Sequence, residues 1–207
     1  MIRTRRLKFD YDNKVFFKFP DINLKGNENL LIIGSSGIGK TTLLHLLAGL
    51  LSSKSGSIEL YGKKISELSS HKLDNFRRDN IGIIFQRPHF VNSLNVKENL
   101  QLAQYIANKK DYGRIESILK SLNIFDKSNK KTNQLSQGEK QRASIALAII
   151  NSPKLILADE PTSSLDDDNC NNVIKLLKKQ ASEFGAQLIV ITHDSRLKKH
   201  FKNSIEL

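Results

Sequence analysis

A glycine-rich stretch at residues 34–42 constrains the fold of this chain more than any other feature. It reads GSSGIGKTT, and its three glycines let the backbone turn so tightly that successive N–H groups converge on one anion. Lys40 adds a mobile positive charge, and Thr41 adds a hydroxyl suited to Mg²⁺. The apolar run before it, 30–33, is typical of a buried strand, and residues 42–50 are typical of a buried helix. This context favours a phosphate-binding loop over the alternative of an ordinary glycine turn.

Composition narrows the class of protein. The 207 residues include 33 basic and 21 acidic side chains, and the net charge of +12 suits an anionic ligand, a nucleic acid or an anionic membrane surface without choosing among them. We interpret most of this charge as a solvated basic surface. The single cysteine, Cys170, has no partner for an internal disulfide. No apolar run approaches the roughly 18 residues that span a bilayer, and the first residues lack a signal peptide's apolar stretch, so we expect a soluble, cytosolic protein.

Alternating apolar and polar residues near the N-terminus predict a small, partly antiparallel sheet. The segments that alternate are 6–11, 15–19 and 57–65. Tyr11 or Phe9 could offer a ring on which an adenine stacks, and a place in the core of the sheet is the equal alternative for both.

Three more short apolar strands each end at polar residues. They cover residues 81–85, 154–158 and 187–191, and they lead into Gln86, Asp159-Glu160 and Thr192-His193. Carboxyl ends of parallel strands share the sheet edge where α/β proteins bind ligands, so we expect these residues to meet the loop at Gly34. If strand geometry persists, Asp159 and Glu160 point to opposite sides, so that one reaches Mg²⁺ and the other faces a terminal phosphate and a water. Polar loops, a helix cap and a structural histidine are the alternatives.

The stretch between two of these strands has helical character and predicts an inserted subdomain, followed by a helix that opens at 135–139. Ser136 and Glu139 match a capping box, which by itself accounts for both residues. Gly138 in the first turn costs about 1 kcal/mol relative to alanine. Close approach of a phosphate to the free N–H groups would compensate, so this helix start is a second candidate anion site.

In combination and in order, these motifs resemble those of the ATP-binding cassette (ABC) ATPases over nearly the whole chain. Residues 34–42 are similar to a Walker A motif and Gln86 to the Q-loop glutamine; 135–139 resemble the ABC signature, and 155–160 a Walker B motif with its following glutamate. Residues 164–166 are similar to the D-loop and His193 to the switch histidine. Signature loops usually carry Ser-Gly-Gly, whereas this chain has Ser-Gln-Gly at 136–138.

The resemblance implies an α/β fold: a P-loop NTPase core with a mostly parallel sheet, a small N-terminal antiparallel β subdomain and an inserted helical subdomain. We expect one ABC ATPase domain over 1–207, with the nucleotide-binding core and β subdomain at 1–87 and 153–207, and the helical subdomain at 88–152.

The resemblance also implies an ATPase that uses ATP and Mg²⁺. Glu160 is then the general base or water-orienting residue, His193 clamps the γ-phosphate, and Gln86 couples the metal and water to the helical insertion. With Lys40 these form the catalytic set, and Thr41, Gln86 and Asp159 form the metal set. The expected ATP-binding residues are Tyr11, Gly34, Ser35, Ser36, Gly37, Ile38, Gly39, Lys40, Thr41, Thr42, Ser136, Gln137, Gly138 and Asp166.

The implied partners are a second copy, bound head to tail on ATP binding so that its signature completes the site, and a separate transmembrane permease subunit. This places the chain in the cytoplasm, peripheral at the inner face of the cell membrane. It looks most like the stand-alone cassettes of the lipoprotein-releasing, macrolide-export and cell-division group. The alternatives are a soluble cassette acting on nucleic acid or ribosomes, favoured only by the basic charge, and a regulatory module that binds ATP without hydrolysing it. We do not expect a nucleic-acid partner.

Overall fold

A parallel sheet forms the centre of the computed structural model, which describes residues 1–12, 15–163 and 165–207. Its strand order is β10-β4-β9-β8-β7, and all neighbouring strands pair in parallel. The strands are β4 (Leu30–Ile33), β7 (Ile81–Ile84), β8 (Leu155–Asp159), β9 (Gln187–Thr192) and β10 (Asn203–Glu206). Every residue of β4, β8 and β9 is buried, which explains their nearly continuous apolar sequences.

The two faces of this sheet belong to two cores. Ile189 and Ile191 of β9 pack in the core that contains α1 (Lys40–Leu47), whereas Leu188 and Val190 pack in the core that contains α5 (Gln137–Ile149) and α6 (Asp167–Glu183). Alternate residues of one apolar strand therefore hold helices on opposite faces.

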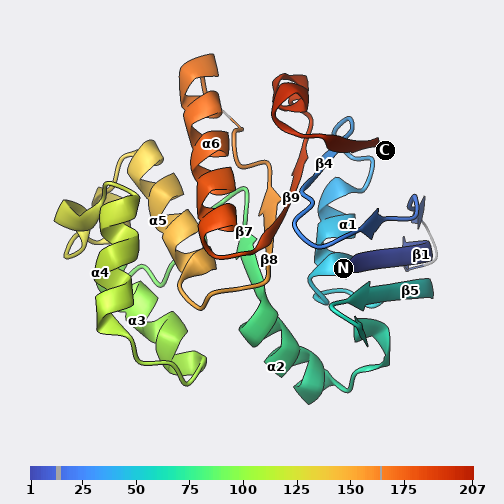
Figure 1. Ribbon diagram of the computed structural model, residues 1–207, viewed down its shortest axis with the longest axis horizontal. Coiled ribbons are helices and arrows are strands. Elements are labelled where there is room, and N and C mark those ends of the chain that lie inside the picture. The colour runs from blue at the N-terminus through green and yellow to red at the C-terminus, as the bar shows by residue number, and fades with distance from the viewer. Residues whose placement is uncertain (13–14, 164) are drawn as a thin grey trace.

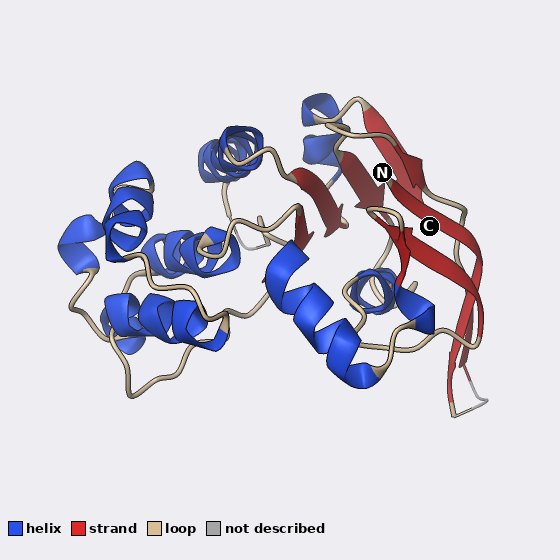
Figure 2. Ribbon diagram, turned by 60° about the horizontal axis from the view of Figure 1, so that its bottom comes forward, coloured by secondary structure: helices blue, strands red, loops and turns tan. Residues whose placement is uncertain are grey.

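A second, antiparallel sheet lies beside the first, as the curved layer of strands in Figure 2 shows. It contains β1 (Ile2–Tyr11), β2 (Val15–Lys18), β3 (Asn23–Leu24), β5 (Ser55–Leu60) and β6 (Lys63–Lys64). The pairing of β1 with β5 shifts register between Arg5 and Lys8. Gly56 lies at this irregularity with φ 90°, and a Cβ there would be 2.5 Å from the carbonyl oxygens of Arg5 and Arg6, so only glycine fits. The expected antiparallel N-terminal sheet is confirmed.

Helices between β7 and β8 form a layer on the far side of the molecule from the antiparallel sheet (Figure 1). They are α3 (Val96–Ile106), α4 (Tyr112–Ser121) and α5, while α2 (Ser70–Asn80) precedes β7. Asn95 and Glu98 cap α3 reciprocally. Arg114 of α4 donates to the carbonyl oxygens of Ile149 and Ile150 at the end of α5. Short 3₁₀ turns complete the chain: η1 (Ile65–Glu67), η2 (Phe125–Lys127), η3 (Thr132–Gln134) and η4 (Ser195–His200).

Helix α5 belongs to both parts of the structure. It contacts α3 and α4 but also packs against β7, where a Cβ on Gly82 would lie 2.2 Å from the carbonyl oxygen of Ala148. The subdomain boundaries at 88 and 152 stay a prediction. Among the described residues, no helix is both long and apolar enough to cross a membrane.

Candidate functional site

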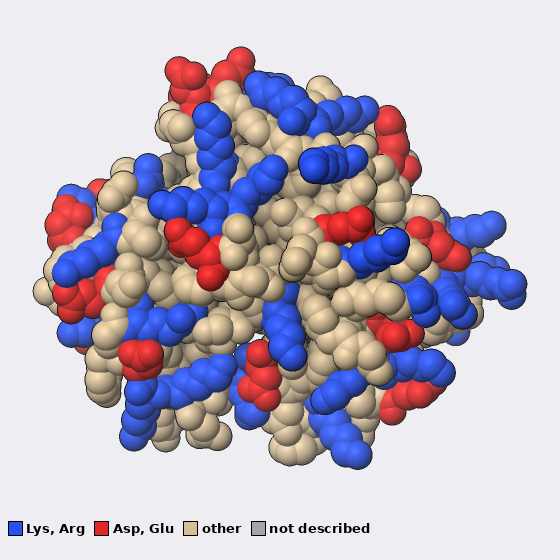
Figure 3. Space-filling model, in the orientation of Figure 1, with Lys and Arg blue, Asp and Glu red and all other residues tan. Residues whose placement is uncertain are grey.

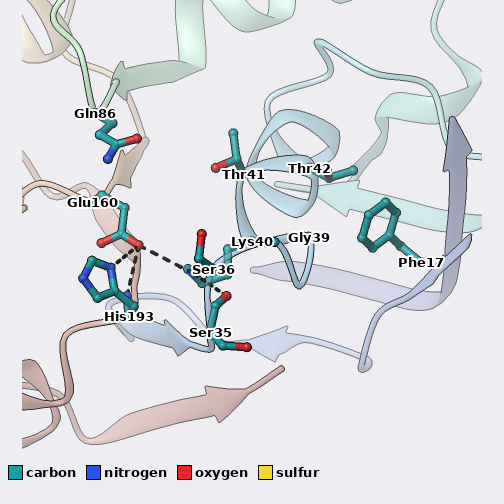
Figure 4. A pocket seen from close by; sticks show the side chains of 11 residues that line it. Phe17, Ser35, Ser36, Gly39, Lys40, Thr41, Thr42, Gln86, Glu160 and His193 are labelled. Atoms are coloured by element: carbon teal, nitrogen blue, oxygen red, sulfur yellow. Dashed lines mark hydrogen bonds and ion pairs between the residues drawn. The ribbon is translucent and has the colours of Figure 1, made fainter. Parts of the chain in front are cut away.

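The loop between β4 and α1 lines a cavity of about 510 Å³ that lies at the carboxyl edge of the parallel sheet (Figure 4). Gln86 follows β7, Glu160 follows β8 and His193 follows β9, and all three line the same cavity. The structure thus brings residues from widely separated parts of the sequence to one edge, because their strands run in parallel.

The loop is built for the close approach of an anion. Gly37 and Gly39 have φ values of 83° and 102°, in the left-handed region that glycine adopts without strain. Gly39 is also the N-cap of α1 and supplies no side-chain cap to the N–H groups of the first turn. The positive end of the helix dipole and these free donors therefore face the cavity.

Lys40 holds its ammonium group inside the loop. The side chain is only 7% exposed, and Nζ donates to the carbonyl oxygens of Gly34 (2.8 Å) and Ser35 (2.9 Å). It also lies 3.6 Å from Oε1 of Glu160. The cavity therefore contains a buried positive charge whose counterion is the carboxylate of Glu160. A bound phosphate could take the place of that carboxylate as the counterion.

Two residues about 30 positions later in the sequence, Thr192 and His193, hold the carboxylate of Glu160 in one orientation. Its Oε2 accepts a hydrogen bond from Oγ1 of Thr192 (2.8 Å), and its Oε1 accepts one from the backbone N–H of His193 (3.0 Å) and lies 2.9 Å from Nδ1 of that residue. The backbone of Glu160 has φ 48°, which is unusual for a residue with a side chain. The buried carboxylate is thus oriented while the imidazole of His193 stays more than half exposed.

Asp159 carries a partner on one oxygen only. Oδ2 accepts from Oγ1 of Thr41 (2.9 Å), whereas Oδ1 is buried and has no hydrogen-bond partner among the described residues. Burial raises the pKa of Asp159 above its ordinary value, and the bond from Thr41 opposes that rise. A hydroxyl beside a carboxylate with a free oxygen fits Mg²⁺, which takes one or two protein ligands and completes its shell with phosphate and water. Gln86 lies across the cavity from Thr41 (Figure 4).

Phe17 is the aromatic residue that lines this cavity, and sequence reasoning missed it. It contacts the loop so closely that a Cβ on Gly39 would be 2.5 Å from its ring. Tyr11 does not line the cavity; its hydroxyl bonds to Oγ1 of Thr42 (3.2 Å), and its ring meets Phe17 edge-on at 6.2 Å. Phe9 lies behind in the core, 8% exposed. The sequence contained a partial signal, because the alternation in 15–19 places Phe17 on one face of its strand. In the structure Phe17 pairs with Phe9 of β1.

The ATP-binding residues predicted from the signature and the D-loop lie outside this cavity. Ser136 caps α5, with Glu139 reciprocating, and Asp166 caps α6 by accepting from the N–H of Asn169. Gln137, Gly138 and Asp166 line a separate cavity of about 300 Å³ between α5 and α6. Nothing lies within 4 Å of a Cβ placed on Gly138, so the helix start is open to a ligand. Ser164, the first residue of the predicted D-loop, lies outside the described residues.

Comparison with known proteins points to one family. A family model described as "ABC transporter" matches residues 18–163. The lipoprotein-releasing system ATP-binding protein LolD of Buchnera aphidicola subsp. Acyrthosiphon pisum is 44% identical over 171 residues, 81% of this chain and 75% of LolD. The macrolide export ATP-binding/permease protein MacB of Mannheimia succiniciproducens is 37% identical over 90% of this chain but only 29% of MacB.

Solved structures agree with this grouping. The dimeric structure of MJ0796, described as a bacterial ABC transporter cassette, is 31% identical and has a TM-score of 0.89, covering 100% of this chain and 94% of that one. A second structure of MJ0796, described as a post-hydrolysis state bound to ADP and Pi, is 30% identical with the same TM-score of 0.89 and the same coverage, 100% and 94%.

Proposed function

The chain belongs to the ABC transporter family and is an ATP-binding, ATP-hydrolysing subunit of that kind; from this premise we propose how its own residues carry out the reaction, with Mg²⁺, at a site shared between two copies. The observation that supports this most is the convergence of Lys40, Glu160 and His193 with the glycine loop around one cavity. Each of these groups has a role that the geometry allows.

The loop and Lys40 bind the β- and γ-phosphates. The N–H groups at the start of α1 provide fixed donors, and Nζ of Lys40 exchanges its carbonyl partners, which lie 2.8 and 2.9 Å away, for phosphate oxygens. Thr41 and Asp159 would hold Mg²⁺, which would supply positive charge to neutralise the charge that develops on the phosphate oxygens.

Glu160 orients the attacking water and accepts its proton at Oε1. Lys40 lies 3.6 Å from this oxygen, so transfer of Lys40 to the phosphates removes a positive charge that competes with the water for this carboxylate. His193, whose ring is exposed to the cavity and bonded to the same oxygen, donates to the γ-phosphate. Gln86, from the segment that leads to α3, lines the cavity, where it would contact the metal and the water and so link the site to the helical layer.

The partner copy supplies the second anion site. Ser136 and Gly138 do not reach the cavity of their own chain, and Gly138 is open, so we propose that they close the cavity of a second chain bound head to tail. The similar cassette MJ0796 has been solved as a dimer. Phe17 or Tyr11 stacks on the adenine at the end of the cavity away from Glu160.

The dimer acts on a separate transmembrane permease subunit, and the chain therefore works in the cytoplasm at the inner face of the membrane. MacB is described as ATP-binding and permease in one protein, and this chain corresponds to 29% of its length. The face in Figure 3 does not favour nucleic acid, because acidic side chains are interspersed there among the basic ones.

Glu160→Gln tests the reaction. It removes the proton acceptor and keeps the shape, so we expect the rate of phosphate release to fall about 100-fold or more while ATP binding persists and the ATP-bound dimer accumulates. Phosphate release and size-exclusion chromatography with ATP measure the two effects. Glu183→Gln, an exposed change of the same charge at the end of α6, is the control. Near-normal hydrolysis by Glu160→Gln would remove Glu160 from this role.

A further inference from the structure

Arg196, three residues beyond His193, joins two segments that lie far apart in the sequence. Its Nε donates to Asp194 (2.8 Å to Oδ1) and its Nη2 to Oδ2 of the same carboxylate (2.6 Å). The outer nitrogens also reach the start of α6, where Nη2 donates to the carbonyl oxygen of Leu165 (3.4 Å) and Nη1 pairs with Asp167. One guanidinium therefore ties the turn after β9 to the segment that opens α6.

A chain of hydrogen bonds continues from Asp194 to the carboxylate of Glu160. The N–H of Asp194 donates to Oγ1 of Thr192 (3.0 Å), and this hydroxyl donates to Oε2 of Glu160 (2.8 Å). Thr192 is fully buried, so its hydroxyl has no competing water. A hydroxyl that accepts one bond and donates another transmits a change of position from one side to the other.

The exposed pair of Arg196 with Asp167 adds little to stability. The side chain of Arg196 is 41% exposed and that of Asp167 is 79% exposed, and ion pairs this open contribute little to the free energy of unfolding. By contrast, Asp194 is only 12% exposed, and its bonds to Arg196 hold its pKa below the ordinary value. The planar guanidinium fixes both carboxylate oxygens while reaching two further acceptors, which a lysine ammonium on a flexible stem does not do.

We propose that Arg196 is a positioning residue for ATP hydrolysis, which fixes Asp194 against the start of α6 and, through Thr192, orients the carboxylate of Glu160. This inference rests on the proposed role of Glu160 as the group that activates water. Asp166, the N-cap of α6, lines the same cavity as Gly138, which we propose lies at the interface with the second copy, so closure of the dimer reaches Glu160 along the same chain of bonds.

The test compares Arg196→Gln and Arg196→Lys with wild type in steady-state ATP hydrolysis by the full chain. We expect both variants to lower kcat about tenfold and to change the KM for ATP less than twofold, because the phosphate-binding loop is untouched. Arg78→Gln is the matched control, since it also removes an arginine from an exposed pair with an aspartate, on α2. The variants at 196 should lower the thermal midpoint no more than this control does.

Thr192→Val provides a second measurement. If Arg196 acts through Thr192, the double variant Arg196→Gln, Thr192→Val hydrolyses ATP as slowly as Thr192→Val alone, whereas independent roles multiply the two losses. The inference is overturned by multiplied losses, by a kcat within twofold of wild type in either Arg196 variant, or by a loss of kcat that follows a lowered thermal midpoint.

Glu160→Gln in the same assay separates this inference from the proposed function. Normal hydrolysis by Glu160→Gln overturns the role of Glu160, and with it the reason for positioning that carboxylate. An inactive Glu160→Gln together with a fully active Arg196→Gln overturns the inference about Arg196 alone.

Discussion

Two adjacent carboxylates, Asp159 and Glu160, show how neighbouring residues acquire different roles. Glu160 accepts bonds on both oxygens, from Thr192 at the end of β9 and from His193 after it, whereas Asp159 leaves one buried oxygen without a partner among the described residues. Burial disfavours the ionised form of Asp159 and raises its pKa. The ionised carboxylate of Asp159 therefore lowers the stability of the nucleotide-free fold, as we expect of a group that binds a cation.

The cost at Asp159 has a testable sign. Because the pKa in the folded state is raised, the ionised side chain destabilises the fold at neutral pH, and this loss fades as the pH falls through the raised pKa toward the ordinary value of 3.8. Asp159→Asn should thus raise the thermal midpoint of the nucleotide-free protein at neutral pH, by about 2–4 °C for each kcal/mol relieved, and should abolish Mg²⁺-dependent hydrolysis. Thermal melts over a pH series measure the first effect.

Asp194→Asn is the control of opposite sign. Hydrogen bonds from Arg196 lower the pKa of Asp194, so its ionised form stabilises the fold above the ordinary pKa, and that contribution is lost as the pH falls through the lowered value. Its substitution should lower the thermal midpoint at neutral pH. A fall in the midpoint for Asp159→Asn as well would contradict the account of Asp159.

The aromatic residues at the other end of the cavity allow a second test. A base stacked on a ring contributes about 1–3 kcal/mol, so loss of the stacking ring should weaken ATP affinity about 5- to 150-fold. We expect this for Phe17→Ala, because Phe17 lines the cavity. Tyr11→Phe removes only the bond to Thr42 and should change the affinity little. Titration with a fluorescent ATP analogue measures both; a large loss confined to a Tyr11→Ala variant would assign the stacking to Tyr11 instead.

At the scale of the elements, the strands and their ends could be predicted because burial on both faces leaves a plain record in the sequence. β4, β8 and β9 are almost wholly apolar, and the polar residues at their carboxyl ends mark the edge where the ligand binds. The contact of α5 with β7 could not be predicted. Its only mark in the sequence is Gly82, which is a single glycine within an apolar run.

Contacts that depend on how elements pack could not be predicted. The contact of Phe17 with Gly39 depends on how the β1–β2 pair packs against the loop. Alternation in the sequence predicts the face of the strand on which Phe17 lies, but not which residues it contacts. The bond from Thr192 to Glu160 requires the register in which β8 pairs with β9, where Asp159 lies opposite Ile191. Arg196 contacts Leu165 and Asp167, which lie about 30 residues earlier in the sequence, and no sequence pattern predicts this contact.

At the scale of the whole molecule, the two proposed anion sites lie in separate cavities of one chain. The glycine loop lines one cavity, and Gly138 lines another between α5 and α6. If each site is assembled from two copies, a mixed dimer can place both defects in one site. A defect in the loop of one chain and a defect at Gly138 of the other then leave the second site intact. Gly138→Asp suits this experiment, because the position has room for a side chain and a carboxylate in the first turn of a helix stabilises it, while the added charge repels phosphate.

A mixture of Lys40→Ala and Gly138→Asp chains should recover activity that neither variant has alone. In the mixed dimer, the intact loop of the Gly138→Asp chain faces the intact α5 start of the Lys40→Ala chain, which makes one complete site. Random pairing of equal amounts makes about half of the dimers mixed, each with one complete site of two, so phosphate release should peak at about a quarter of the wild-type rate near a 1:1 ratio. Mixing Lys40→Ala with Glu160→Gln is the control: both defects lie in the same cavity, so each site of that mixed dimer contains one of them and no activity should return. If hydrolysis took place within single chains, neither mixture would recover, and the shared site would have to be abandoned.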